Sequence, residues 1–436
     1  MGGQGVVAAV LTPTMTLDLA TIRSQFPALA VTDDGRQRFY FDNPAGTQVP
    51  QSVADSMSDC LLHSNANLGG YFQTSHLADK VVSDARDAMV DFLNAPSADE
   101  IIFGQNMTTM TLHLSRSIGR YFNAGDELIL SQMCHDANVE PWVLLARDFD
   151  LEVRWLPFDV ETFEFDLAKL DDLLTSKTRL VCIGGASNLT GTINDVKTVC
   201  SKAREAGAWS FVDAVQSAPH VSTDVQALGC DFLACSAYKF FGPHQGILWG
   251  RREVLEALEP YKVRPASDKI PGCFETGTQS HEGMAGVAAA VDYFAWIGET
   301  MAGDFHAANR QYDGRCLYTH AAMDCLFAYE KDLAERLIDG LQSIGGVTVQ
   351  GVTDSDALHR RVPTVSFTHA GKAPADIART LGERNIFVWN GHNYAIEPAK
   401  ALGILDSGGA VRVGPVHYNS IEEIDVLLNS LEDVLA

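Results

Sequence analysis

The stretch FVDAVQSAPHVSTDVQALGCDFLACSAYKFFGPHQGILWG, residues 211–250, decides the fold of this chain. It contains or borders three short apolar runs, at 209–215, 232–237 and 246–250, which have the length of buried strands. Unbroken apolar strands that alternate with helical patterns are typical of a mostly parallel sheet covered by helices on both faces. We therefore predict an α/β fold.

The same alternation extends toward the N-terminus. Four further strand candidates lie at 100–104, 127–131, 151–157 and 179–185. Residues 196–208 have apolar side chains at helical spacing and a glycine near the end, which predicts a helix between two strands.

The chain changes in texture after about residue 300. A long helix is predicted over roughly 327–344 and a closing amphipathic helix over 421–436. Between them lie a short helix from Pro374 and the strand candidates VTVQGV, TVSFTH, IFVWNG and AVRVGP. We expect a large domain over 17–300, a smaller C-terminal α+β domain over 301–436, a turn-rich segment 17–80 that packs on both, and a loose tail over 1–16.

Composition and charge disfavour several function classes. Of the 436 residues, 46% are hydrophobic and 20% are charged, which is ordinary for a globular protein, and the net charge is −24. Such an acidic chain is poorly suited to nucleic acid or to an anionic membrane surface, and no apolar run is long enough to span a bilayer. The nine cysteines form no CxxC pair and no zinc-ribbon spacing, so we expect no metal site and a cytoplasmic location.

Lys239 stands between two aromatic residues, Tyr238 and Phe240, in an apolar stretch. A lysine is seldom buried, because removing an ammonium group from water is costly. Two interpretations are open. The stem of Lys239 lies on apolar surface while its head reaches water, or the amine is buried, has lost its proton and serves as a nucleophile that forms a Schiff base.

Polar residues follow several of the predicted strands. In parallel sheets ligands bind beyond the carboxyl ends of the strands, and the residues found there are Thr108, His135, Asn188, Asp213, Gln216, Ser236, Tyr238 and Lys239. Singly, each has a structural alternative as a helix cap or a loop residue. Jointly, a phosphate cradle at a helix start, an aromatic ring, a carboxylate and an amine are what pyridoxal phosphate requires.

The quoted stretch resembles the signature of the class V aminotransferases, which include cysteine desulfurases and selenocysteine lyases. The likeness extends from FDNPAG (41–46) through FETGTQSHEG (274–283) to VRVGPVHYNSIEEID (411–425), and SAYKFFGPH resembles the desulfurase-like subgroup most. The resemblance implies the fold of pyridoxal-phosphate-dependent transferases of the aspartate aminotransferase type, a homodimer with shared active sites, and a small amino acid as substrate.

The resemblance also implies a role for each site residue. Lys239 would form the Schiff base and move the proton, Asp213 would pair with the pyridine nitrogen, and His135 would stack on the ring. Asn188 and Gln216 would hydrogen-bond the phenolic oxygen. The phosphate would be held by Met107 through its backbone, Thr108, Ser236 and Thr278 of the partner subunit. Arg412 would bind the substrate carboxylate, although an ordinary strand-surface arginine is its alternative.

Two departures from the family pattern bear on function. Relatives usually carry histidine where this chain has Tyr238, which can still hydrogen-bond a phosphate. Desulfurases carry a persulfide-forming cysteine in a context like GHHCA, whereas this chain reads GHNYA and has Tyr394 there. A phenol cannot carry sulfur as a persulfide, and Cys134 and Cys273, the other candidates, are better explained as buried structural residues. We expect no protein persulfide relay.

The leading prediction is a pyridoxal-phosphate enzyme that breaks a C–S bond of a small amino acid by β-elimination, with Tyr394 either an acid toward the leaving group or part of the pocket wall. Transamination and epimerisation stay open. A non-catalytic binding protein of the same fold and an NAD-dependent oxidoreductase are the competing classes, and the second lacks a GxGxxG motif after its first strand.

Overall fold

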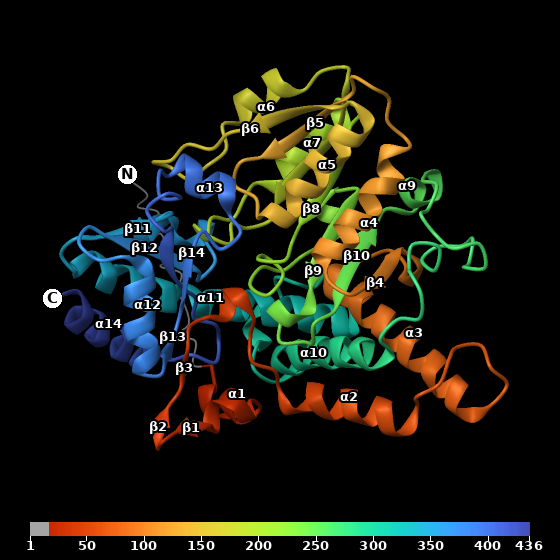
Figure 1. The fold of residues 1–436 in the computed structure, drawn as a ribbon. Coiled ribbons are helices and arrows are strands. Elements are labelled where there is room, and N and C mark those ends of the chain that lie inside the picture. Colours follow the sequence, from red (N-terminus) through yellow and green to blue (C-terminus); the bar gives the residue numbers. More distant parts are fainter. Residues whose placement is uncertain (1–16) are drawn as a thin grey trace, which may run out of the picture.

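The computed structural model describes residues 17–436, so the tail predicted over 1–16 lies outside the described residues. A large layer of sheet and helices occupies one side of the molecule, and a smaller group of strands and helices from the C-terminal part occupies the other (Figure 1). Within the described residues, no helix combines the length and the apolar character that crossing a bilayer demands.

A seven-stranded sheet forms the large layer. Its strands run in the order β4 (Ile101–Gly104), β10 (Gly246–Gly250), β9 (Phe232–Ser236), β8 (Trp209–Asp213), β7 (Thr178–Gly184), β5 (Glu127–Ser131) and β6 (Glu152–Leu156). The five strands from β9 to β6 are parallel, and β10 is antiparallel to both of its neighbours. The predicted mostly parallel sheet is confirmed, and all seven strand candidates are strands.

Helices cover both faces of this sheet, because successive side chains of a buried strand point to opposite sides. In β8, Val212 belongs to the core on one face and Phe211 to the core on the other. The Val212 face packs on α3 (Gln73–Leu93), α7 (Val196–Glu205) and α10 (His281–Thr300). The Phe211 face packs on α4 (Met107–Gly119), α5 (Glu140–Phe149) and α9 (Arg252–Ala257). Two short helices, α6 (Leu167–Leu173) and α8 (Val225–Leu228), complete the layer.

The smaller part is built on an antiparallel sheet in the order β11 (Val347–Gln350), β12 (Val365–His369), β15 (Ala410–Val413) and β14 (Trp389–Gly391). Helices α12 (Pro374–Glu383), α13 (Ile396–Ala401) and α14 (Ile421–Leu435) surround it. The run IFVWNG, predicted as one strand, is divided: β13 (Ile386–Phe387) pairs instead with β3 (Phe39–Tyr40) of the N-terminal segment. The N-terminal segment also contains α1 (Leu19–Ser24), β1 (Thr32–Asp33), β2 (Arg36–Gln37) and α2 (Gln51–His63).

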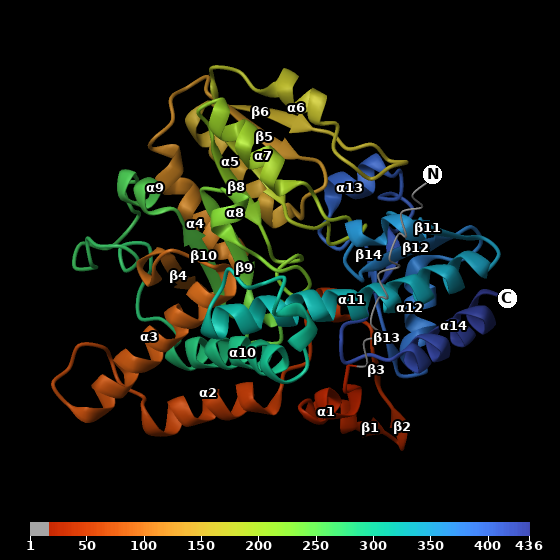
Figure 2. The ribbon, with the colours of Figure 1, turned by 180° about the vertical axis from the view of Figure 1, so that it is seen from behind.

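One long helix, α11 (Gly314–Ser343), runs from the large layer into the smaller part, as both views show (Figures 1 and 2). Its first half packs on α10 and supplies Met323 and Leu326 to the large core, while Leu333 and Leu337 belong to the core of the smaller part. The sequence predicted only its second half, over 327–344. The first half was missed because it is rich in small and polar residues, whose burial depends on contact with α10.

Candidate active site

The carboxyl ends of the parallel strands border a narrow cavity of about 170 Å³. Nearly all of the predicted site residues line it: Met107, Thr108, His135, Asn188, Asp213, Gln216, Ser236, Tyr238 and Lys239. They come from five separate stretches of chain, each placed at the same sheet edge by the strand before it. The topology thus gathers residues that lie up to 132 positions apart (107 to 239).

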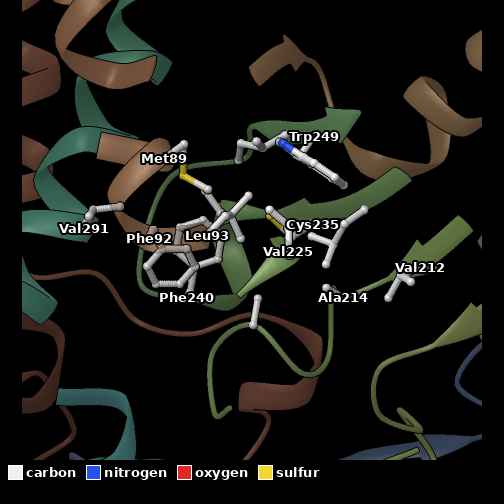
Figure 3. Close-up of a cluster of buried hydrophobic side chains, with 14 of the residues drawn as sticks. Met89, Phe92, Leu93, Val212, Ala214, Val225, Cys235, Phe240, Trp249 and Val291 are labelled. Atoms are coloured by element: carbon white, nitrogen blue, oxygen red, sulfur yellow. The ribbon is translucent and has the colours of Figure 1, made fainter. Parts of the chain in front are cut away.

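Lys239 is buried in this cavity, with 7% of its surface exposed. It follows β9 in a single 3-10 turn, Ala237–Lys239, and the next residue, Phe240, anchors that turn in the hydrophobic core. Figure 3 shows Phe240 beside Phe92 and Leu93, and the rings of Phe240 and Phe92 stack with centroids 5.0 Å apart. The apolar flank of Lys239 therefore fixes the backbone that presents the amine.

The Lys239 amine has few polar partners. It donates to the backbone carbonyl of Pro44 and lies 3.5 Å from Oε1 of Gln216. Burial and, to a smaller extent, the charge of Arg412 lower the pKa of Lys239 to about 7, against the opposing effect of Asp213. An amine with this pKa is largely uncharged slightly above neutral pH. Lys239 is therefore a buried amine and not one whose head reaches water, while its role in a Schiff base stays a prediction.

Asp213 ends β8 at the wall of the same cavity and is 6% exposed. Burial raises the pKa of its carboxyl to about 6, although the backbone N–H of Val215 donates to Oδ1 at 2.9 Å and Lys239 also favours the charged form. A cationic partner stabilises the charged form of a buried carboxyl, and a protonated pyridine nitrogen would be such a partner.

The N-terminus of α4 forms one end of the cavity. Asn106 caps the helix by accepting from the N–H of Thr109 at 2.9 Å, and Ser236 Oγ accepts from the N–H of Met107 at 3.1 Å. Thr108 is exposed and borders the cavity. The positive end of this thirteen-residue helix, next to the Ser236 and Thr108 hydroxyls, suits an anion such as a phosphate.

His135 and Tyr394 pack on one another where the narrow cavity opens outward. Their rings are nearly parallel, at 19°, with centroids 5.4 Å apart. Nδ1 of His135 accepts from the N–H of Ala137 at 3.0 Å, and burial lowers the pKa of His135 to about 3, with further lowering from Lys239 and Arg412. His135 is therefore a neutral ring at physiological pH.

Arg412 lies on β15, buried at 5% exposure, so it is not a surface arginine. One guanidinium nitrogen donates to the carbonyl of Asn188 at 3.0 Å, while Nε of Arg412 and Oδ1 of Asn188 have no hydrogen-bond partner within residues 17–436. Burial lowers the pKa of Arg412 to about 10, which leaves it charged at neutral pH. Buried polar atoms without partners indicate a ligand site, because leaving them unpaired is costly.

Tyr394 and Arg412 border the larger cavity outside the narrow one, whereas Thr278 is the predicted site residue that borders neither of the two. It is exposed in the segment before α10 and borders a different cavity of about 450 Å³, together with His244 and Thr109. A shared active site would account for the separation, since the predicted contact of Thr278 is with the partner subunit.

Four residues of the site escaped the sequence analysis. Pro44 and Thr364 hydrogen-bond Lys239 and Gln216, and Asn393 accepts from the Asn188 amide at 2.7 Å. Asp42 lies near Arg412, whose charge opposes the effect of burial, and the pKa of Asp42 is raised to about 6. Asp42 and Pro44 stand in FDNPAG and Asn393 in GHNYA, two motifs that could have indicated them, whereas Thr364 carries no such signal.

A larger cavity of about 790 Å³, the outer cavity, adjoins the narrow one. None of the nine cysteines lines either of the two cavities. All nine lie within residues 17–436, where they are buried and form no disulfide. Burial raises the pKa of Cys134 to about 12 and also raises the pKa of Cys273. Both thiols are therefore protonated at neutral pH, unlike a reactive thiolate.

A sequence profile of the class V aminotransferases matches residues 39–317 and 315–427 of this chain. The chain belongs to this family. The class V aminotransferases and the cysteine desulfurases among them are pyridoxal-phosphate enzymes, so the predicted family and enzyme class are confirmed.

Relatives of this class V aminotransferase match it along almost its entire length. A probable cysteine desulfurase of Streptomyces coelicolor is 32% identical, and the alignment covers 96% of this chain and 97% of the relative. An aminotransferase-like protein of Gibberella zeae is also 32% identical, over 96% and 99% of the two chains. The apo structure of a cysteine desulfurase from Thermococcus onnurineus NA1 superposes with a TM-score of 0.83 at 27% identity, over 95% and 98% of the chains. The predicted transferase fold is confirmed.

Proposed function

We propose that this class V aminotransferase binds pyridoxal phosphate through Lys239 and breaks a C–S bond of an amino acid by β-elimination, without passing sulfur to a thiol of its own. The observation that carries the proposal is the narrow cavity, where an amine of lowered pKa and a carboxyl of raised pKa lie near a helix N-terminus. A NAD-dependent oxidoreductase would give the buried amine no role, and the chain lacks a GxGxxG motif after its first strand.

The residues of the cavity fit the cofactor. The N-terminus of α4 would hold the phosphate together with Ser236 and Tyr238, Asp213 would face the pyridine nitrogen, and the unpaired Oδ1 of Asn188 would meet the phenolic oxygen. His135 is a neutral ring at the cavity wall and suits stacking on the cofactor. When bound, pyridoxal phosphate supplies an electron sink that makes the Cα–H bond of an amino acid acidic.

Lys239 and Arg412 would handle the amino acid itself. Both border the outer cavity of about 790 Å³. The outer and the narrow cavity adjoin one another, because His135, Asn188 and Lys239 line both of them. The guanidinium of Arg412 would bind the α-carboxylate and so orient the substrate, with Nε as its free donor. The Lys239 amine, uncharged slightly above neutral pH, would take the proton from Cα and hold it at Nζ.

The loop that carries Tyr394 supports elimination over a persulfide relay. Tyr394 lies at the outer cavity in place of a cysteine, and its backbone carbonyl accepts from the N–H of Asp136 at 2.7 Å, which ties the loop to the site. Asn393 and Tyr394 both have left-handed backbone conformations, with φ of 50° and 58°, so the loop is held in a shape that costs energy. The Tyr394 hydroxyl is available to give a proton to the departing sulfur.

The test is to incubate the holoenzyme with cysteine and measure three products. We expect sulfide, pyruvate and ammonia in solution and an unchanged intact mass of the protein. Sulfur added to Cys134 or Cys273 would overturn the proposal in favour of a relay. Formation of a keto acid that retains sulfur, or of D-cysteine, would show transamination or epimerisation instead.

The proposal includes a homodimer, because Thr278 borders a cavity of its own, away from Lys239. Leu68 and Val263 border a further cavity together with Thr278, and both are exposed. Leu61, Leu62, Tyr71 and Phe72, which come before or after Leu68 in the chain, are large exposed apolar side chains as well. Sedimentation at assay concentration should give twice the mass of the 47.3 kDa chain. A fully active monomer would contradict it. Nine cysteines that form no disulfide within residues 17–436 also suit the cytoplasmic location that we propose.

A further inference from the structure

The outer cavity is much larger than a cysteine side chain requires. It encloses about 790 Å³ and reaches from Lys239 and Arg412 to the surface. Its walls carry apolar and aromatic side chains: Leu112, Pro141, Leu144, Trp389 and Tyr394. Three of them are large and exposed, by 37% for Leu112, 51% for Trp389 and 68% for Tyr394.

These side chains converge from three separate elements. Leu112 lies one helical turn after Thr108 on α4, Pro141 and Leu144 lie on the first turns of α5, and Trp389 and Tyr394 belong to β14 and the loop after it. Apolar residues on a single helix could follow from its periodicity alone. Here three elements place apolar side chains around one cavity, as in a site that binds an apolar group of a ligand, and we call these side chains the wall.

Trp389 is adjacent to the residue proposed to hold the substrate. In the ladder between β14 and β15, Trp389 stands directly opposite Arg412. Side chains directly opposite in an antiparallel pair lie on the same face of the sheet, with Cβ atoms roughly 5 Å apart. A substrate whose carboxylate is on Arg412 therefore has an indole ring beside it.

The polar residues that line the outer cavity include two carboxylates, beside Asn390, His392 and Asn393. Asp136 and Glu140 both border it, and burial together with the nearby charges of Glu140 and Glu397 raises the pKa of Asp136. The basic side chains among its lining residues are Lys239 and Arg412 at the base and His392 just after β14, whose charge lowers the pKa of Asp136. Two carboxylates and one histidine lie away from the base. The mouth thus disfavours a substituent that ends in a carboxylate or phosphate.

We infer that the substrate is a cysteine whose sulfur carries a bulky apolar or aromatic substituent; this inference rests on the proposed elimination. The substituent would lie against Trp389, Leu112 and Leu144 while Arg412 holds the carboxylate. In the overall reaction the Cβ–S bond breaks, sulfur leaves with the electron pair and gains a proton as a thiol, and one water completes the release of pyruvate and ammonium. No oxidant or reductant is needed.

A binding experiment tests the wall without turnover. The probes are 2-amino-5-phenylpentanoate, which has methylene in place of sulfur and cannot eliminate, and 2-aminopentanoate, which lacks the phenyl ring. We expect calorimetry with the holoenzyme to show at least tenfold tighter binding of the phenyl compound, since burying an aromatic ring is favourable. Trp389→Ala should remove most of that preference. Val426→Ala, an exposed apolar residue on α14 that borders neither cavity, is the matched control and should keep it.

A turnover experiment separates this inference from the function on which it rests. We expect benzyl thiol from S-benzylcysteine at a kcat/KM at least tenfold above that for cysteine, and little release from S-(2-carboxyethyl)cysteine. Sulfide release from cysteine with no preference for either phenyl compound would overturn the inference and leave the elimination standing. A phenyl preference in binding with no thiol released from any substrate would overturn the elimination and leave apolar recognition standing.

Discussion

Two of the clusters of buried polar side chains in this protein differ in how fully their hydrogen bonds are satisfied. The first joins His220, Tyr293, Glu330 and His417 at the middle of α11, where that helix passes between the two parts of the molecule. Glu330 is completely buried. It lies 2.7 Å from Nδ1 of His220, accepts from the N–H of His417 at 3.0 Å, and His417 in turn lies 2.8 Å from the Tyr293 hydroxyl.

The second cluster surrounds Lys239, in the narrow cavity and beside it. It is as deeply buried, but within residues 17–436 Nε of Arg412 and Oδ1 of Asn188 have no partner, and the Asp213 carboxylate has a single hydrogen bond, from Val215. In the first cluster, over the same residues, Nδ1 of His417 alone lacks a hydrogen bond, and it lies 3.6 Å from Glu330.

The difference shows that burial of polar groups does not by itself mark an active site. In the cluster at Glu330 the polar groups hydrogen-bond one another, and these bonds link α10, α11 and the loops after β8 and β15. In the cavity some donors and acceptors stay unpaired and can bind a ligand, and these unpaired groups lower the stability of the fold. The first cluster should therefore control stability and the second should control chemistry.

The largest expected effect is from Lys239→Met, which removes the amine and keeps the stem. Borohydride should no longer trap the cofactor on the protein, and turnover should fall below detection. Because no buried ion pair is broken, the free energy of unfolding should change by no more than about 1 kcal/mol. Mass spectrometry of the reduced protein and urea unfolding measure the two. Lys197→Met, at an exposed site on α7, is the control; an adduct on a lysine other than 239 would contradict the assignment.

Glu330→Gln should have the opposite effects to Lys239→Met, because it should lower stability and leave cofactor trapping intact. Removing the charge from the paired cluster should lower the free energy of unfolding by about 3 kcal/mol at neutral pH, while cofactor trapping by Lys239 persists. Asp332→Asn, exposed on the same helix, is the control and should cost little. A Glu330 variant of unchanged stability would show that the cluster is not the structural one.

The acid dependence sharpens this second prediction. Burial alone would raise the pKa of Glu330, but the charges of His220 and His417 and their hydrogen bonds outweigh it, so the pKa lies below its usual value of 4.5. A lowered folded-state pKa gives stability that is present above pH 4.5 and lost as the pH falls through the folded pKa. The gap between wild type and variant in urea unfolding should therefore narrow in acid.

The smallest expected effect concerns the pH dependence of cofactor uptake. Only the uncharged amine attacks the aldehyde, so the rate at which apoenzyme takes up pyridoxal phosphate should fall roughly tenfold per pH unit below the Lys239 pKa of about 7. Arg412→Gln removes a charge that lowers this pKa, and the midpoint should move to higher pH. Glu330→Gln should leave it in place. Stopped-flow absorbance measures the rate, and a midpoint near the ordinary lysine value of 10.5 would refute the buried-amine assignment.

Local pattern was enough to predict the large sheet and much of the site. The apolar runs at 209–215 and 232–237 are strands because β-rich runs that short can be buried on both faces in a parallel sheet. Parallel strands end at one edge, which is why Asp213 and Lys239 could be expected together before any distance was known. The family resemblance added Arg412, which is far along the chain and on another sheet.

The sequence by itself determined the parallel sheet, the amine and the carboxyl at its edge, and the absence of a cysteine at position 394. Only the tertiary structure decided the rest. Whether Trp389 faces solvent or a substrate depends on its register opposite Arg412, and whether Glu330 is a surface charge or a buried acceptor depends on where α11 crosses the molecule. Such contacts join residues tens to hundreds of positions apart, and no local propensity encodes them. They arise because separate elements bury their apolar faces against one another, which also buries some polar groups. Those polar groups then hydrogen-bond one another or stay unpaired until a ligand binds.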